Sequence, residues 1–241
     1  MKPVVIKIGT GVLTREFDGK LDRAALTRLV TAVAELVISG RSCILVSSGA
    51  VGAGISQLGL SEYPSDVPTR QACAAVGQTR LMHGYENLFN NFELNVAQLL
   101  LTADDFSNSA RLARVEDTLA RLAQCPQIVP IINENDSVAV EELSLGDNDM
   151  LSARVARLIG ASQLILLSNI DGLLAPGSTE VISYVENVDD VLSFVRDDKG
   201  KFSIGGMASK LKAVRLAVDA GIETVIAHGK SPERLAAITR G

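Results

Sequence analysis

Two lysines lie beside glycine-rich turns, a combination that indicates phosphate binding. Lys7 directly precedes Ile8-Gly9-Thr10-Gly11, and Lys210 closely follows Gly205-Gly206. Glycine lets the backbone approach phosphate oxygens, and a helix N-terminus offers N–H groups and a positive dipole end. Lys7 also belongs to an apolar run, Val4 to Ile8, where a buried lysine needs a charged partner. We therefore expect both lysines to neutralise phosphate charge.

A second cluster combines carboxylates with amides. Its members fall within 17 residues: Asn133, Asn135, Asp136, Asp147, Asn148 and Asp149. Asn and Asp also favour turns and caps for local reasons, and Asp147 is equally well explained in that way. Asn135-Asp136, however, directly follows a predicted strand. A carboxylate can accept hydrogen bonds from an ammonium group, while amides and hydroxyls can bind a carboxylate, so the cluster favours a zwitterionic substrate.

Three standard nucleotide-binding motifs are absent. Gly229-Lys230-Ser231 resembles the end of a Walker A loop, but the first glycine that this loop requires would stand at position 224, which is Thr224. The pair Gly9 and Gly11 lacks the third glycine of a dinucleotide-binding fingerprint, because position 14 is Thr14. Protein-kinase signatures are missing too. A nucleotide would have to be bound by another scheme.

Strand and helix patterns alternate along the whole chain and would position these groups. Short apolar runs predict six strands, over residues 4–8, 43–47, 95–101, 128–132, 164–167 and 224–227. Helical spacing predicts helices after an N-cap at Asp22, over 70–92, 112–122, 149–159 and 211–218, and from Ser231-Pro232 onward. Near-continuous apolar strands between amphipathic helices are typical of an α/β protein with a parallel sheet covered on both faces. Pro130 predicts an edge position or a bulge for its strand.

The carboxyl ends of the predicted strands carry small and polar residues. Ligands of open parallel sheets bind at this edge, so we expect the site there. The strand ends in question are Gly9-Thr10-Gly11, Ser47-Ser48-Gly49-Ala50, Asn133-Glu134-Asn135-Asp136 and Ser168-Asn169-Ile170-Asp171.

The composition excludes several classes of protein. The 241 residues carry a net charge of −5, which argues against a general nucleic-acid binder. No apolar run is long enough for a transmembrane helix, and the N-terminus lacks a signal-peptide pattern. Three scattered cysteines, outside any C-x-x-C pair, favour reduced thiols. These features predict a cytoplasmic protein without a membrane partner.

The motifs together resemble the amino acid kinase family, and within it the glutamate 5-kinases. The resemblance spans the chain from Lys7 to about Gly229. The motifs that carry it are Lys7-Ile8-Gly9-Thr10, Ser47-Ser48-Gly49-Ala50, Ile132-Asn133-Glu134-Asn135-Asp136, Gly146-Asp147-Asn148-Asp149 and Gly205-Gly206-Met207-x-x-Lys210. It implies a three-layer α/β/α sandwich with a mainly parallel central sheet. It also implies transfer of the γ-phosphoryl of ATP to the side-chain carboxylate of L-glutamate, the first step of proline biosynthesis.

The resemblance assigns roles to individual residues. Lys7 and Lys210 would contact the phosphates, and Asp149 would hold the two lysines in place. The implied glutamate-binding residues are Ser48, Gly49, Ala50, Asp136 and Asn148. The implied ATP-binding residues are Lys7, Gly9, Ser168, Asn169, Ile204, Gly205, Gly206, Met207, Ala208, Ser209 and Lys210. No protein ligand for a metal is implied, since nucleotide phosphates and water would largely hold Mg²⁺.

The chain departs from the family pattern at a few positions. Relatives often carry Thr-Asp in place of Ser168-Asn169 and Thr in place of Ile204. Many relatives also append a PUA domain, which we do not expect here, so residues 1–241 are predicted to form a single kinase domain. The family further implies a dimer or tetramer and functional coupling to a glutamyl-phosphate reductase.

Other functions stay open at this point. A kinase of the same fold could act on acetylglutamate, aspartate, carbamate or UMP, and a non-catalytic protein could sense glutamate or proline. Asp136 favours a substrate with a free ammonium group, and the pair of lysines favours catalysis over sensing. A glutamate side chain has a pKa of about 4.3, so the acceptor is already ionised at neutral pH and needs no general base.

Overall fold

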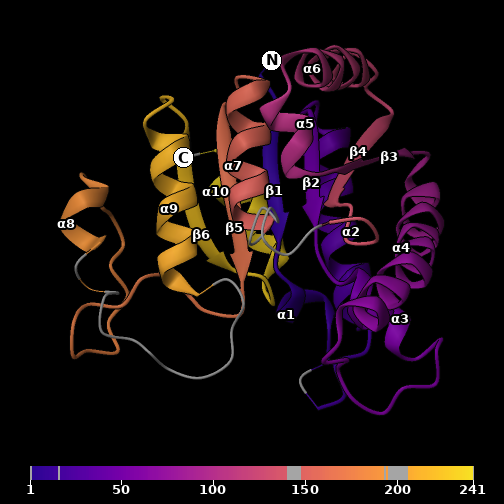
Figure 1. Cartoon of the computed structure of the whole chain (residues 1–241). Coiled ribbons are helices and arrows are strands. Elements are labelled where there is room, and N and C mark those ends of the chain that lie inside the picture. Colours follow the sequence, from indigo (N-terminus) through magenta and orange to yellow (C-terminus); the bar gives the residue numbers. More distant parts are fainter. Residues whose placement is uncertain (1, 16, 140–147, 193, 195–205, 241) are drawn as a thin grey trace.

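A six-stranded parallel sheet forms the centre of this computed structural model, which describes residues 2–15, 17–139, 148–192, 194 and 206–240 (Figure 1). The strand order is β3-β4-β2-β1-β5-β6, and every pairing is parallel. The strands are β1 (Val4–Ile8), β2 (Cys43–Ser47), β3 (Asn95–Leu101), β4 (Ile128–Glu134), β5 (Gln163–Ser168) and β6 (Glu223–His228). All six predicted strands are therefore present, with ends shifted by at most two residues.

Helices cover both faces of the sheet. The first apolar core joins one face to α2 (Arg23–Ile38), α4 (Val67–Phe89) and α10 (Leu235–Ile238). The second joins the other face to α6 (Ser109–Ala123), α7 (Asn148–Leu158) and α9 (Met207–Val218), which lie in front of the sheet in Figure 1. The three-layer α/β/α prediction is confirmed. Asp22 caps α2 as predicted, accepting hydrogen bonds from the N–H groups of Ala24 and Ala25.

Short helices and a loop region complete the described chain. The short helices are α1 (Thr10–Leu13), α3 (Ala50–Ile55), α5 (Ala103–Ser107) and α8 (Val188–Leu192), with 3₁₀ turns at Asn90–Phe92 and Pro232–Arg234. Helix α8 lies beyond α9, away from the sheet (Figure 1). A small third core, made of Leu173, Val191 and Leu211, attaches this region to α9. Within the residues described, no helix combines the length and apolar character needed to cross a membrane.

The period of two along each strand decides which helical layer a side chain meets. In β1, Val4, Ile6 and Ile8 belong to the first core, whereas Val5 belongs to the second. Lys7 therefore points to the same side as Val5, toward the layer that contains α7 and α9. This alternation is what brings Lys7 to the residues described below.

The expectation drawn from Pro130 was wrong. Strand β4 lies inside the sheet, between β3 and β2, and its register with β3 runs without interruption from Ile128 to Glu134. Proline cannot donate a ladder hydrogen bond, but the pairing of β4 with β2 begins only at Ile131. Pro130 thus occupies a part of an internal strand that has no partner on the β2 side.

Candidate active site

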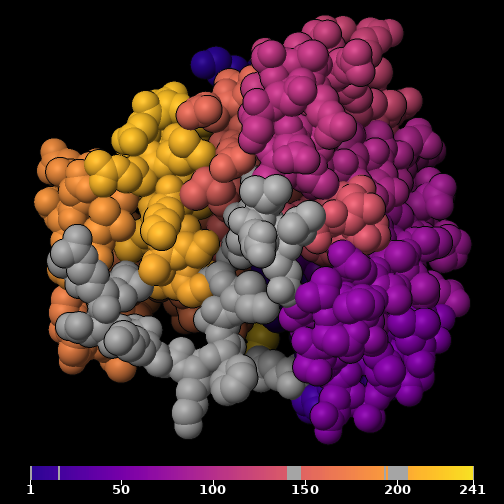
Figure 2. All heavy atoms as spheres, in the orientation of Figure 1, coloured from indigo at the N-terminus to yellow at the C-terminus, as the bar shows by residue number. Residues whose placement is uncertain are grey.

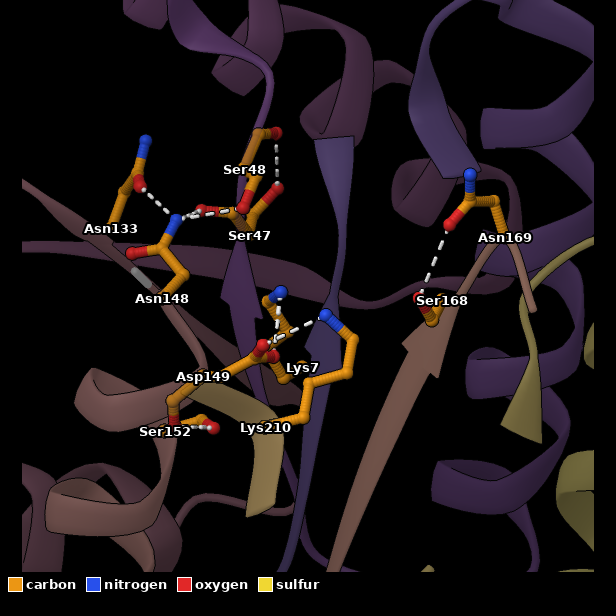
Figure 3. Close-up of polar contacts among 10 residues, drawn as sticks. All are labelled: Lys7, Ser47, Ser48, Asn133, Asn148, Asp149, Ser152, Ser168, Asn169 and Lys210. Atoms are coloured by element: carbon orange, nitrogen blue, oxygen red, sulfur yellow. Dashed lines mark hydrogen bonds and ion pairs between the residues drawn. The ribbon is translucent and has the colours of Figure 1, made fainter. Parts of the chain in front are cut away.

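Lys7, Asp149 and Lys210 meet at the carboxyl edge of the sheet (Figure 3). Nζ of Lys7 lies 2.7 Å from Oδ1 of Asp149, and Nζ of Lys210 donates to Oδ2 of Asp149 at 3.0 Å. Lys7 comes from β1, Asp149 from the first turn of α7 and Lys210 from the first turns of α9. The structure thus brings together the three residues that were predicted to be catalytic.

Burial makes this cluster electrostatically strong. The Asp149 side chain is fully buried, and those of the two lysines are 4% and 9% exposed. Two ammonium groups and one carboxylate leave the three residues with one net positive charge. Charges interact more strongly where water is excluded, so the cluster is well suited to stabilise charge on a phosphoryl group.

The predicted ATP-binding residues that the structure describes stand at the ends of β1 and β5 and at the start of α9. Gly9 follows β1, and its N–H donates to the carbonyl of Leu167 in β5 at 3.0 Å. A Cβ added to Gly9 would lie 3.1 Å from that carbonyl oxygen and 3.7 Å from Nζ of Lys7, so glycine keeps the backbone close to both. Ser168 ends β5, and its hydroxyl contacts the Asn169 side chain at 3.4 Å.

Helix α9 begins at the site. Gly206 precedes the helix, and Met207, Ala208 and Ser209 form its first turn, directly before Lys210. The first N–H groups of a helix have no partner within it, and they carry the positive end of the helix dipole. Ile204 and Gly205, two further predicted ATP-binding residues, lie outside the described residues.

All five predicted glutamate-binding residues line one cavity of about 380 Å³. Ser48, Gly49 and Ala50 line it from the end of β2 and the start of α3, Asp136 from the turn after β4, and Asn148 from the start of α7. Gly49 has a φ of 100°, a conformation in which glycine is strongly favoured. The structure thus gathers these residues from three separate segments.

The Asn148 side chain is oriented by two carbonyl oxygens, which can only accept hydrogen bonds, and by the hydroxyl of Ser48. Its Nδ2 donates to the backbone carbonyl of Ser47 at 2.9 Å, to Oγ of Ser48 at 2.8 Å and to Oδ1 of Asn133 at 3.0 Å (Figure 3). Because a carbonyl oxygen cannot donate, the NH₂ end must face Ser47. Oδ1 of Asn148 is buried and has no hydrogen-bond partner in the described part of the chain. It is an acceptor available to a ligand donor.

Asp136 carries a perturbed carboxyl group. Burial, with a smaller contribution from the carboxylate of Glu134, raises the pKa of Asp136 to about 6. A bound cation would reverse part of this effect by favouring the ionised form. Asp136 and Asn148 both line the same cavity, so two acceptors are available there.

Comparison with known proteins identifies the family. The model of the amino acid kinase family matches residues 2–228. The chain belongs to this family. Within it, the chain is 44% identical to the glutamate 5-kinase of Symbiobacterium thermophilum, over 100% of the chain and 93% of that relative. The corresponding enzyme of Clostridium tetani is 40% identical, with 100% and 92% covered.

The chain covers only part of the length of some of its relatives. It is 42% identical to the glutamate 5-kinase of Caldanaerobacter subterraneus over 99% of its own length, but it covers 65% of that relative. Among solved structures, carbamate kinase from Giardia lamblia bound to AMP-PNP matches with a TM-score of 0.65. That match covers 99% of this chain and 95% of the other at 16% identity, so it shows the fold alone.

The cavity of this amino acid kinase is also lined by Arg70 of α4, which the sequence did not indicate. Asn133 and Glu134, at the end of β4, line it too. The sequence placed these two among the polar strand ends, at the carboxyl edge where ligands bind, but assigned no individual role to them. Arg70 carries no such signal, since its helix has no motif and reaches the cavity only through tertiary packing.

The two groups of site residues come from different parts of the fold. The cavity residues lie on segments up to residue 148, and the remaining predicted ATP-binding residues lie mainly on β5 and α9. Figure 2 shows α3 and α4 on one side of the visible face and α8 and α9 on the other. The Lys7–Asp149–Lys210 cluster joins the two sets, since it combines β1, α7 and α9.

Proposed function

We propose that this chain transfers the γ-phosphoryl of ATP to the side-chain carboxylate of L-glutamate, forming L-glutamyl 5-phosphate. The observation that carries the proposal is the buried bridge from Lys7 through Asp149 to Lys210, beside a cavity with acceptors for an ammonium group. The identity of 40–44% to proteins named glutamate 5-kinase supports the same substrate.

The mechanism follows from the charges of the two reactants. The acceptor carboxylate is ionised at neutral pH, so no residue has to remove a proton from it. The barrier lies in bringing this anion in line with a polyanion. Catalysis then consists of positioning and charge stabilisation, as in phosphoryl transfer generally. Lys7 and Lys210 supply the positive charge, and Asp149 fixes the position of both ammonium groups.

Substrate recognition uses the cavity at the end of β2 and β4. Asp136 and Oδ1 of Asn148 accept hydrogen bonds from the α-ammonium group of glutamate. The Ser48 hydroxyl and the backbone N–H groups of Gly49 and Ala50 face the α-carboxylate. An N-acetylated amino acid would leave the Asp136 charge unpaired, which disfavours acetylglutamate as the acceptor.

The nucleotide binds across the ends of β1 and β5 and the start of α9, at the residues assigned above. Mg²⁺ would accompany ATP and supply further neutralisation of phosphate charge. Nucleotide phosphates and water would largely hold it.

The wider setting is also part of the proposal. The reaction is the first step of proline biosynthesis, performed in the cytoplasm by a homo-oligomer whose subunits each contain one kinase domain. Acyl phosphates react readily with nucleophiles, including water. A reductase that consumes the product quickly would limit this loss, so we include functional coupling to such an enzyme.

Trapping of the product tests the proposed reaction. Hydroxylamine added to enzyme, ATP, Mg²⁺ and L-glutamate should yield a hydroxamate, because an acyl phosphate acylates it. Aspartate and N-acetyl-L-glutamate serve as matched acceptors and should yield little hydroxamate. UMP would give ADP without hydroxamate, and a sensor would give neither. Hydroxamate from N-acetyl-L-glutamate alone would assign the chain to another substrate.

A further inference from the structure

Helix α4 directs two buried polar side chains at the sheet. Gln78 and Tyr85 lie seven residues apart, which places them on the same side of the helix. Gln78 is 8% exposed and Tyr85 is fully buried within an otherwise apolar helix face that includes Leu81 and Phe89. Buried polar groups of this kind are costly unless they make hydrogen bonds.

Gln78 holds the side chain of Asn133. Nδ2 of Asn133 donates to Oε1 of Gln78 at 2.9 Å, and Oδ1 of Asn133 accepts from the backbone N–H of Glu134 at 2.9 Å. The same Oδ1 accepts from Nδ2 of Asn148 at 3.0 Å. Gln78 therefore fixes the NH₂ group of the Asn133 side chain, and the oxygen of the same amide orients Asn148.

Tyr85 holds the end of β2 in a similar way. Its hydroxyl lies 2.9 Å from Oγ of Ser47, and Oγ of Ser47 donates to the carbonyl of Ser48 at 3.2 Å. Because the single hydrogen of Ser47 is used in the second bond, Tyr85 donates in the first. Burial raises the pKa of the Tyr85 hydroxyl, so it keeps this hydrogen at neutral pH. The backbone carbonyl of Ser47 in turn accepts from Asn148.

Strand periodicity explains why both strand ends reach α4. In β2, Leu45 belongs to the core under α4, so Ser47, two residues on, points to the same side. In β4, Ile131 belongs to the same core, so Asn133, two residues further on, also points toward α4. Strands β2 and β4 are neighbours in the sheet, so the side chains of Ser47 and Asn133 extend from the same face at adjacent strand ends.

We propose that Gln78 and Tyr85 are positioning residues for the amino acid substrate. Through Asn133 and Ser47 they hold the Asn148 amide with Oδ1 turned toward the ligand, while touching no substrate themselves. This inference rests on the proposed function, because it assigns Asn148 to the ammonium group of glutamate. Helix α4 thereby positions residues of the glutamate-binding cavity, and we expect it to have no such effect on the ATP-binding residues.

The test compares Gln78→Leu with Gln163→Leu in the full chain. Gln163 is a matched control because it is 6% exposed and also makes side-chain hydrogen bonds, but it donates to Glu223 and to the carbonyl of Ile238. We expect Gln78→Leu to raise KM for glutamate about tenfold, with KM for ATP unchanged, because Asn133 loses its acceptor. Gln163→Leu should lower the melting temperature without changing either KM.

Tyr85→Phe gives a second, milder variant that keeps the ring stacked on Phe89 and removes only the hydroxyl. We expect KM for glutamate to rise about threefold in it. Adding Gln78→Leu to Asn133→Ala should produce little further change, because both act on one chain of hydrogen bonds.

Two results would overturn the inference. One is an unchanged KM for glutamate in both Gln78→Leu and Tyr85→Phe, and the other is an equal rise of both KM values. Absence of hydroxamate from the wild-type chain with glutamate would instead refute the proposed function. The wild-type turnover therefore tests the reaction, and the ratios between variants test the role of α4.

Discussion

Nζ of Lys210 lies 3.0 Å from Oδ2 of Asp149, although 61 residues separate the two in sequence. The second oxygen of the same carboxylate lies 2.7 Å from Nζ of Lys7. One buried carboxylate thus determines the position of two cations, each of which reaches the site from a different element. In the proposed reaction both lysines act on one phosphoryl group, and this carboxylate holds their two ammonium groups at the site.

Replacement of Asp149 by asparagine should damage both catalysis and folding. Asn has the same size, but its NH₂ end must face one ammonium group. We expect kcat to fall about a hundredfold or more, and the free energy of unfolding to fall by about 3 kcal/mol because buried charges lose their partner. Steady-state kinetics and denaturant unfolding measure the two effects. Asp189→Asn, at an exposed ion pair with Arg215, should change neither appreciably.

Replacement of Lys210 should lower turnover far more than it weakens substrate binding. We expect Lys210→Ala to lower kcat by roughly two to three orders of magnitude while KM for glutamate moves little, because the charge is needed mainly in the transition state. Lys212→Ala, two residues away at an exposed position, is the control and should stay near wild type. Near-normal turnover of Lys210→Ala would contradict a role in catalysis.

The affinity for glutamate should fall below about pH 6. The pKa of Asp136 is raised from 3.8 to about 6, so the carboxylate that pairs with the ammonium group is protonated as the pH drops through this value. We expect KM for glutamate to rise below pH 6 and KM for ATP to stay level. In Asp136→Asn, KM for glutamate should be high and independent of pH between 5 and 8. A wild-type KM in this variant would indicate a turn residue only.

The raised pKa of Asp136 also affects the stability of the fold. A salt-bridged carboxylate has a lowered pKa and stabilises the fold more as the pH rises, whereas Asp136 should do the opposite. Between pH 3.8 and about 6 the folded chain keeps a proton on Asp136 that the unfolded chain releases. This group therefore lowers stability as the pH rises through that window. We expect Asp136→Asn to raise the melting temperature at pH 7.5 and to have no such effect at pH 3.5.

Contact between α3 and α4 should be sensitive to one methyl group. A Cβ at Gly77 would lie 1.8 Å from the carbonyl oxygen of Ala50, so the two helices would have to separate. We expect Gly77→Ala to cost about 2 kcal/mol of stability and to raise KM for glutamate, because Ala50 lines the cavity. In Gly84→Ala, on the same helix, the new Cβ would meet only a Leu26 side-chain atom at 3.1 Å. That control should keep its KM, and equal losses in both variants would refute the argument.

The sequence alone determined the elements and the edge of the sheet where the site lies. Apolar runs predicted all six strands, and local capping chemistry located the start of α2 at Asp22. These features depend on residues close together in the chain, so the pattern carries them. The rule that ligands bind at the carboxyl ends of parallel strands then indicated Lys7, Ser48 and Asp136 without any knowledge of strand order.

Only the tertiary structure decided how the site is assembled. Pro130 lies in an internal strand because the sheet order and register are set by packing. Arg70 reaches the cavity, and Gln78 meets Asn133, 55 residues away, because α4 packs across the ends of β2 and β4. Asn148 meets Ser47 across 101 residues of sequence. Such contacts depend on the relative placement of whole elements, which no local pattern of residues contains.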